Sequence, residues 1–232
     1  MRQLVDLLVE RRPPEGPYLI GITGAVAVGK STMSATLSTE LSTRLGATCS
    51  VLGSDAFLWS NEVLEDRGLT MRKGFPESYD TVALRASVAE LAEGRGVEVP
   101  SYSHRTYNIE PGRTQRIEPV GLIIVEGLHL TRFVGEDLHV SVHLDAPAAV
   151  VEEWYVARLA TLVSAARSDR DSFYRLFVDL DARGVETVAR DFWSTINLVN
   201  LREHIDPWRD RADIIVTLND EHQIVALQKR AD

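Results

Sequence analysis

Two kinds of hydrophobic pattern alternate along this chain of 232 residues. Short runs of consecutive apolar residues are typical of strands buried on both faces, and apolar residues that recur every three or four positions are typical of helices. The predicted strands are 18–23, 47–53, 121–127, 137–145 and 212–218. Because strands alternate with helices, the pattern predicts an α/β fold of three layers, with a doubly wound, mostly parallel sheet between two layers of helices.

The predicted helices fill the intervals between the strands. The clearest follows residue 30, where Leu37, Leu41 and Leu45 recur every four residues and Gly46 supplies the stop. The other predicted helices are 1–12, 82–94, a long helix opened by Pro147 that runs through Arg158, 171–183 and 185–204, the last two separated by Gly184. Residues 58–80 and 95–119 lack a core-forming pattern, so we expect loops there and a short tail after residue 218.

Length, charge and cysteine content limit the classes of protein to which this chain can belong. We expect a single domain over 1–232, with 1–16 as a short helix and linker, because one α/β core commonly reaches this size. Acidic residues outnumber basic ones by 34 to 25, and the formal charge of −9 argues against a nucleic-acid partner. Cys49 is the single cysteine, so we expect no disulfide and a cytoplasmic location. No apolar stretch approaches the length of a membrane span, and the N-terminus does not resemble a signal peptide.

The most specific motif follows the first predicted strand. It matches the pattern G-x-x-x-x-G-K-S/T of a phosphate-binding P-loop, whose backbone N–H groups surround a phosphate at the start of a helix. Lys30 is predicted to reach the β- and γ-phosphates of a nucleoside triphosphate as a catalytic residue, and the Ser31 hydroxyl to hold Mg²⁺. The residues predicted to bind the nucleotide are Gly24, Ala25, Val26, Ala27, Val28, Gly29, Lys30, Ser31 and Thr32.

Two acidic residues stand where predicted strands end. Asp55 follows the second strand, and Glu126 closes the apolar run that begins at Gly121. Carboxyl ends of parallel strands are where open α/β sheets bind their ligands. Asp55 is therefore predicted to accept or orient the proton of an acceptor hydroxyl, although a turn or helix-capping role also fits its position. Glu126 resembles the acid that ends a Walker B strand, and Ser31, Asp55 and Glu126 together are the predicted ligands of Mg²⁺.

At this point several motifs together resemble one family, the bacterial type I pantothenate kinases within the phosphoribulokinase and uridine kinase group. The strongest similarity is the run Arg72-Lys73-Gly74-Phe75-Pro76-Glu77-Ser78-Tyr79-Asp80, which matches the family signature almost residue for residue. The other motifs that follow in family order are Tyr102-Ser103-His104, Val125-Glu126-Gly127-Leu128, Asp145-Ala146-Pro147, Trp154-Tyr155 with Arg158, and Ile196-Asn197 with Asn200-Leu201. Several motifs in one order are more specific than any single one.

The resemblance implies a reaction and a set of roles. It implies transfer of the γ-phosphoryl group of ATP, with Mg²⁺, to the primary hydroxyl of pantothenate, the first step toward coenzyme A. The acid that matches Asp55 acts at the acceptor hydroxyl, and the cation that matches Arg158 reaches toward the transferring phosphate. Residues 150–210 would form a helical lid and acceptor pocket. The residues implied to bind the acceptor are Lys73, Tyr102, His104, Tyr155 and Asn197.

The chain also departs from the family pattern, as a shortened and divergent member would. Seventeen residues precede Tyr18 where the family carries a longer helical segment, and His129 stands where the family motif Glu-Gly-Leu-Asn has asparagine. Family phenylalanines that wall the pocket correspond here to Leu159, Leu162, Arg167 and Tyr174. Two alternatives therefore stay open. One is a related kinase with a nucleoside or sugar acceptor, and the other is a nucleotide-binding regulator without turnover. The expected partners are a small molecule and, for the whole protein, a second copy in a homodimer.

Overall fold

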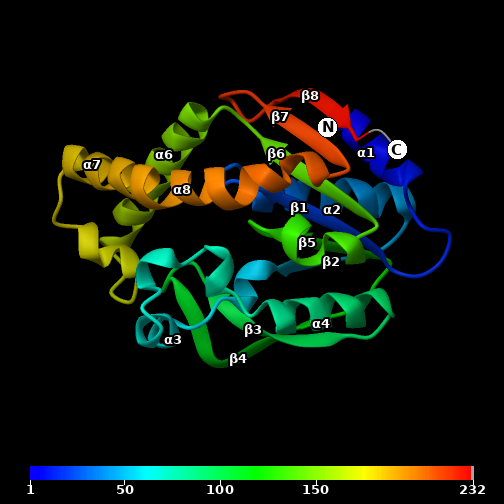
Figure 1. The fold of residues 1–232 in the computed structure, drawn as a ribbon, viewed down its shortest axis with the longest axis horizontal. Helices are drawn as coiled ribbons and strands as arrows, with labels where there is room; N and C mark the ends of the chain where they lie inside the picture. The colour runs from blue at the N-terminus through cyan, green and yellow to red at the C-terminus, as the bar shows by residue number, and fades with distance from the viewer. Residues whose placement is uncertain (231–232) are drawn as a thin grey trace.

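A six-stranded sheet forms the centre of the molecule (Figure 1). The computed structural model describes residues 1–230, and in it the strands lie in the order β2-β5-β1-β6-β7-β8. All neighbouring strands pair in parallel except β8, which is antiparallel to β7. The strands are β1 (Tyr18–Gly24), β2 (Cys49–Gly53), β5 (Leu122–Glu126), β6 (Val140–Asp145), β7 (Ile214–Leu218) and β8 (Ile224–Lys229). The predicted doubly wound α/β fold is confirmed.

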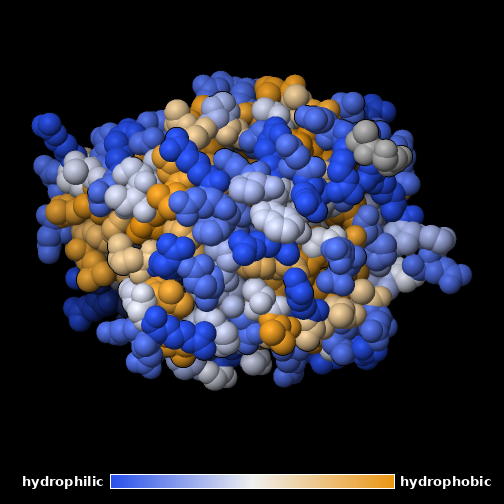
Figure 2. All heavy atoms as spheres, viewed as in Figure 1, coloured by the Kyte–Doolittle hydropathy of each residue, from blue (hydrophilic) through white to orange (hydrophobic). Residues whose placement is uncertain are grey.

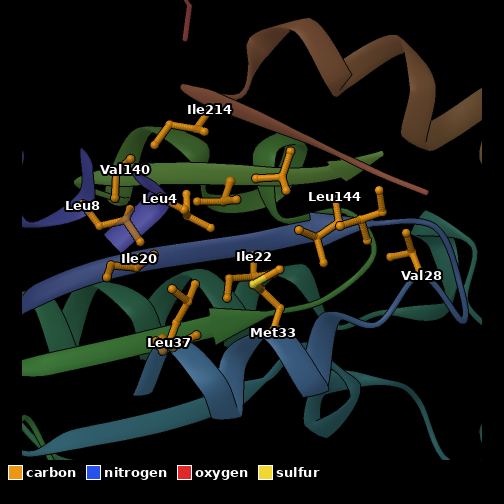
Figure 3. Packing of buried hydrophobic residues seen from close by; sticks show 14 of the residues in the cluster. Leu4, Leu8, Ile20, Ile22, Val28, Met33, Leu37, Val140, Leu144 and Ile214 are labelled. Carbon is orange, nitrogen blue, oxygen red and sulfur yellow. The ribbon is translucent and has the colours of Figure 1, made fainter. Parts of the chain in front are cut away.

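Side chains of the central strands alternate between two cores, one on each face of the sheet. Ile20 and Ile22 of β1 point into the cluster that contains Leu37, shown in Figure 3, whereas Leu19 points into the opposite cluster with Val88. Helices α1 (Arg2–Glu10) and α2 (Lys30–Leu45) cover the first face, and α4 (Thr81–Ala92) and α5 (Leu130–Val134) cover the second. Burial on both faces explains why these strands read as continuous apolar runs in the sequence.

A helical region extends from one end of the sheet. It contains α6 (Ala148–Ala166), α7 (Ala182–Phe192) and α8 (Leu198–Asn200), and in Figure 1 α6 and α7 project to the left. The region has an apolar cluster of its own, made of Leu159, Val163, Ala166, Tyr174, Val185 and Ala189. Figure 2 shows apolar side chains gathered at this end of the molecule. Between α7 and Asp206 the helical run contains two π-helical segments, Trp193–Asn197 and Leu201–Ile205. Such segments are rare and often occur at functional sites.

Three sequence-based predictions of secondary structure were wrong. Residues 95–119 are not a loop but form an antiparallel hairpin of β3 (Val97–Ser103) and β4 (Asn108–Ile117). The segment 58–80 contains the short helix α3 (Asn61–Asp66), and the expected tail after residue 218 contains β8. In each case the element buries few side chains, so its hydrophobic pattern is weak.

The predicted break at Gly184 was also wrong. Gly184 lies in the first turn of α7, where its N–H donates to Asp181 Oδ1 at 2.7 Å. The aspartate therefore caps a helix that runs through the glycine. The helix predicted over 171–183 is instead a 3-10 turn over Phe173–Phe177. Among the described residues, no helix combines the length and the apolar character that a membrane span requires.

Candidate active site

The loop between β1 and α2 has the backbone conformation of a phosphate cradle. Gly24, Ala27 and Gly29 have positive φ angles of 140°, 62° and 96°. A Cβ atom at Gly24 would lie 2.4 Å from the carbonyl oxygen of Leu144, so that position requires glycine. Gly29 is the N-cap of α2. The loop thus brings its backbone N–H groups together at the positive end of a 16-residue helix, an arrangement that attracts anions.

Lys30 bends back over the loop. Its Nζ donates to the carbonyl oxygens of Ala25 at 2.7 Å and Gly24 at 3.2 Å. Burial lowers the pKa of Lys30 to about 8, against which the charges of Asp55 and Glu126 act to raise it. The ammonium group is therefore held by weak neutral acceptors at the place where a phosphate would supply strong charged ones.

Glu126 lies at the carboxyl end of β5 and is joined to α2 by two hydroxyl groups. Ser31 Oγ donates to Glu126 Oε1 at 2.9 Å, and Ser34 Oγ donates to Oε2 at 3.1 Å. Sequence reasoning missed Ser34, although its spacing of three residues from Ser31 places both on one helix face. Hydroxyl and carboxylate oxygens are hard ligands that suit Mg²⁺, so this pair fits the predicted metal. Within residues 1–230, no group of three or more His, Cys, Asp or Glu side chains is arranged to hold a metal by itself.

Asp55 occupies the 3-10 turn Ser54–Phe57 that directly follows β2. Its negative charge acts to raise the pKa of Lys30 in the cradle and also the pKa values of Lys73, Tyr102 and His104. The carboxylate is therefore near both the cradle and the aromatic residues of the hairpin. No side-chain hydrogen bond of Asp55 is found among the described residues, so the carboxylate is available to a ligand.

The predicted acceptor residues come from four separate segments, and the structure brings several of them into contact. Tyr102 and His104, at the end of β3, meet edge to face with ring centroids 5.1 Å apart. Tyr155 of α6 lies near the Asn197 side chain, which acts on its pKa and whose Nδ2 donates to the carbonyl oxygen of Phe192 at 3.2 Å. Arg158, exposed one turn along α6, acts electrostatically on Tyr102, His104 and Tyr155. Desolvation lowers the pKa of His104, so its imidazole is neutral near pH 7.

Lys73 is buried against the hairpin. Its Nζ donates to Asn61 Oδ1 at 2.6 Å and to the carbonyl oxygen of Tyr107 at 2.5 Å, and it lies 4.3 Å from the centroid of the Tyr107 ring. Burial lowers the pKa of Lys73 to about 8, while Asp55 raises it. Sequence reasoning missed Asn61 and Tyr107, because neither belongs to a recognisable motif.

The hairpin is fastened to the helical region by Arg105. Its guanidinium group binds Asp169 through two hydrogen bonds of 2.6 and 2.7 Å and Asp171 through one of 2.9 Å. The backbone N–H of Phe173 donates to the carbonyl oxygen of Arg105 at 2.9 Å, and the Phe173 ring stacks on Tyr107 with centroids 4.9 Å apart. We call this set the Arg105 latch. It joins the hairpin to the segment that follows α6.

The turn between β7 and β8 also reaches the cradle, which the sequence did not predict. The imidazole ring of His222 stacks on the Trp154 indole with centroids 3.7 Å apart, and a Cβ atom at Gly29 would lie 3.4 Å from His222 Cδ2. Trp154 Nε1 donates to the carbonyl oxygen of Asp220 at 2.9 Å. A flat aromatic pair thus stands beside the phosphate cradle.

The fold and this site define the class of protein, a P-loop kinase. A solved structure from Silicibacter sp. TM1040, described as a "putative fructose transport system kinase", has a TM-score of 0.72 and 27% identity, and covers 88% of this chain and 93% of its own. Phosphoribulokinase from Rhodobacter spheroides has the same fold, with a TM-score of 0.54 and 15% identity over 93% of this chain and 76% of its own.

Sequence comparison places the chain within that class. Residues 19–161 match the model of the phosphoribulokinase / uridine kinase family, so the chain belongs to this family. Pantothenate kinase from Streptococcus mutans is 35% identical over 227 residues, which are 94% of this chain and 74% of the relative. The corresponding enzyme from Streptococcus pneumoniae is 36% identical over 226 residues, with the same coverage. The protein is therefore an ATP-dependent phosphotransferase that acts on a hydroxyl acceptor, and its sequence is similar to pantothenate kinases.

Proposed function

We propose that this kinase transfers the γ-phosphoryl group of ATP to the primary hydroxyl of pantothenate. The observation that carries the proposal is that the charge of Asp55 acts both on Lys30 of the phosphate cradle and on Tyr102 and His104 of the hairpin. A phosphoryl transferase needs such an arrangement, because the phosphate donor and the acceptor hydroxyl must meet in line beside one carboxylate. The relatives at 35% and 36% identity, which are named pantothenate kinases, supply the choice of acceptor.

On the nucleotide side, the residues of the loop bind and orient the triphosphate. Lys30 would exchange the carbonyl oxygens of Gly24 and Ala25 for phosphate oxygens. Ser31 and Glu126, already 2.9 Å apart, would hold Mg²⁺ with Asp55 as a further candidate ligand. The metal supplies neutralisation of charge on the transferring group. His222 and Trp154 offer a flat surface next to the loop on which the purine base could stack.

On the acceptor side, Asp55 would take the proton of the attacking hydroxyl. A positioned base is typically worth roughly 10²- to 10⁴-fold in rate. Arg158, on α6, would reach the γ-phosphate and balance its charge, since its own charge already acts on Lys30. Asp55 would thus position the acceptor hydroxyl and Arg158 would stabilise charge on the phosphoryl group. Catalysis of phosphoryl transfer depends mainly on these two effects.

The pocket offers donors that match the groups of pantothenate. Phenol groups of Tyr102 and Tyr155, the Asn197 amide and the neutral imidazole of His104 suit a ligand with hydroxyl, amide and carboxylate groups. Lys73 adds a buried ammonium group beside them. A carboxylate at the far end of the acceptor would be recognised by Lys73 or Arg158.

A sugar is the second candidate acceptor. The structure from Silicibacter, whose title names a fructose transport system kinase, is similar at 27% identity and a TM-score of 0.72. In addition, the positions where the family has phenylalanines hold Leu159, Leu162, Arg167 and Tyr174. Hydroxyl-rich ligands would use the same phenol and amide donors without needing a cation at the far end.

The deciding experiment compares acceptors in one assay. Purified protein would be given ATP and Mg²⁺ with pantothenate, fructose or uridine, and both ADP release and the mass of the phosphorylated product would be measured. Pantothenate is expected to give the highest kcat/KM, and Asp55→Asn should lower product formation by roughly 10²- to 10⁴-fold with every acceptor. A higher kcat/KM for fructose or uridine would replace pantothenate, and ATP hydrolysis without any phosphorylated acceptor would count against all three.

A further inference from the structure

The carbonyl group of Gly74 accepts hydrogen bonds from two distant side chains. His129 Nε2 lies 2.8 Å from the oxygen, and Asn200 Nδ2 donates to it at 2.8 Å. Because a carbonyl oxygen can only accept, the neutral imidazole of His129 must carry its proton on Nε2. The two donors satisfy both lone pairs of the oxygen. We call Gly74, His129 and Asn200 the Gly74 clamp.

Both donors are buried, and their remaining polar atoms are not satisfied. His129 and Asn200 are 3% and 5% exposed. Among the described residues, neither His129 Nδ1 nor Asn200 Oδ1 has a hydrogen-bond partner. An unpaired buried polar atom is unfavourable, so apolar side chains would fill these two positions better if packing were their purpose. The carbonyl oxygen of Gly74 is the contact that accounts for both polar residues.

The clamp fixes the backbone next to Lys73. Gly74 has a φ of 89°, in the left-handed region that favours glycine, and its own N–H donates to Ser78 Oγ at 2.9 Å. Both sides of this residue are therefore held. Lys73 directly precedes it, is 9% exposed, and spans from this turn to Asn61 and to the carbonyl oxygen of Tyr107. Rotation of the peptide group after Gly74 would tilt the turn and pull the ammonium group off the hairpin.

The two donors come from segments that carry other parts of the site. His129 lies three residues after Glu126, and Asn200 lies three residues after Asn197, between the two π-helical segments. The clamp thus joins three segments at one oxygen atom: the loop after β5, the helical run that contains Asn197, and the turn that contains Lys73. Substitution of either donor would therefore alter the acceptor side of the site and leave the phosphate cradle unchanged.

We propose that His129 and Asn200 are positioning residues that hold Lys73 in the acceptor pocket through the carbonyl oxygen of Gly74. The location of Lys73 follows from the structure alone, and only its effect on acceptor binding rests on the proposed function. The location of Lys73 and its effect on acceptor binding can therefore be tested in separate experiments.

The chain contains three lysines, Lys30, Lys73 and Lys229, which makes amine modification a direct readout. The protein would be treated briefly with acetic anhydride, and acetylation of each lysine would be followed by mass spectrometry, with the exposed Lys229 as internal reference. Asn200→Leu keeps the branched shape of the side chain at Cγ and removes the donor. We expect acetylation of Lys73 relative to Lys229 to rise about tenfold, the effect of losing one buried hydrogen bond, while Lys30 is unchanged.

Three further variants separate positioning from general loosening. Leu198→Ala removes a half-buried side chain that packs on the sheet core from the same helix, so it should lower thermal stability without raising acetylation of Lys73. His129→Phe should act as Asn200→Leu does and serves as the second variant if that protein does not fold. His129→Gln restores an N–H donor near the position of Nε2 and should return the acetylation rate toward that of the parent.

Kinetics complete the test. Asn200→Leu should raise the KM for the acceptor about tenfold and leave the KM for ATP unchanged. Unchanged acetylation of Lys73 in folded Asn200→Leu or His129→Phe would overturn the clamp, whatever the acceptor. An equal increase in Leu198→Ala would also overturn it. Failure of pantothenate as an acceptor, together with increased acetylation of Lys73 in Asn200→Leu, would refute the proposed substrate and support the clamp.

Discussion

The pH dependence of ATP binding tests the environment of Lys30. Within residues 1–230 the hydrogen-bond acceptors of the ammonium group are the carbonyl oxygens of Gly24 and Ala25, and burial lowers its pKa from 10.5 to about 8. A bound triphosphate would favour the charged form and raise that pKa again. Below pH 8 the lysine is already charged and ATP binds fully. Above pH 8 the free protein must first take up a proton, so the affinity for ATP should fall.

The magnitude follows from the size of the pKa change. Restoring a pKa of 10.5 from about 8 corresponds to roughly 3 kcal/mol, at about 1.36 kcal/mol per pH unit. The affinity should therefore fall roughly tenfold for each pH unit between 8 and 10, and calorimetry should show uptake of about one proton per ATP at pH 9. These titrations need a fixed excess of Mg²⁺ and buffers of different ionisation enthalpy.

Two variants assign the effect to this side chain. Lys30→Arg stays charged throughout the range, so its affinity for ATP should not depend on pH. Lys30→Ala should bind ATP weakly at every pH and lose phosphoryl transfer while keeping the thermal stability of a folded protein. Equal affinity of the parent for ATP at pH 7.5 and pH 10 would refute this reasoning. A pH dependence that persists in Lys30→Arg would assign the effect to another group, of which Lys73 is the first to examine.

Three further predictions concern the acceptor side. Asp55→Asn should leave the Kd for ATP within a few fold and lower kcat by roughly 10²- to 10⁴-fold, measured by calorimetry and product formation, and a collapse of ATP affinity would instead make Asp55 mainly a metal ligand. Asn197→Ala and Tyr155→Phe should each raise the KM for pantothenate roughly ten- to a hundredfold with little change in that for ATP, and a change confined to ATP would place them elsewhere. Arg105→Met should raise the acceptor KM because it removes the ion pairs with Asp169, and added salt should reproduce that rise in the parent but not in the variant.

Sequence reasoning succeeded where a local pattern fixes the structure. The glycines of the loop are determined by backbone conformation, as the contact between a Gly24 Cβ and the Leu144 carbonyl shows, and such requirements are visible as a motif. The strands of the sheet interior are apolar at most positions because both of their faces are buried. These two features were enough to predict the order of strands and helices around the cradle.

The hairpin was missed because only one of its faces is buried and its second strand is mostly in water. Val97 and Val99 are buried and alternate with the exposed Glu98 and Pro100, but six consecutive residues of β4, 111–116, are exposed. A strand of that kind has no hydrophobic period to detect. Tyr107, which lies between the two strands of the hairpin, was missed because neither a hydrophobic period nor a recognisable motif marks it.

Other site residues were missed because tertiary contacts alone define them. His222 reaches Gly29 only through the turn between β7 and β8, and Asn200 reaches Gly74 across 126 positions of the chain. Ser34 was the exception, because its helical spacing from Ser31 was available in the sequence. The family resemblance selected Tyr102, His104, Tyr155 and Asn197 as candidate acceptor residues, and their role stays a prediction.

The two sides of the site depend on different packing units, and this difference bears on how the acceptor is chosen. The cradle, Ser31 and Glu126 sit at the end of the central sheet, whose strands are buried on both faces. Tyr155 and Arg158 instead lie on α6, which packs with α7 around the separate cluster that contains Leu159 and Tyr174. Substitutions in this cluster can reshape the acceptor wall while the sheet and the cradle stay intact, because the cluster is separate from the cores of the sheet. The Arg105 latch and the Gly74 clamp are among the contacts that join the helical region to the rest of the molecule.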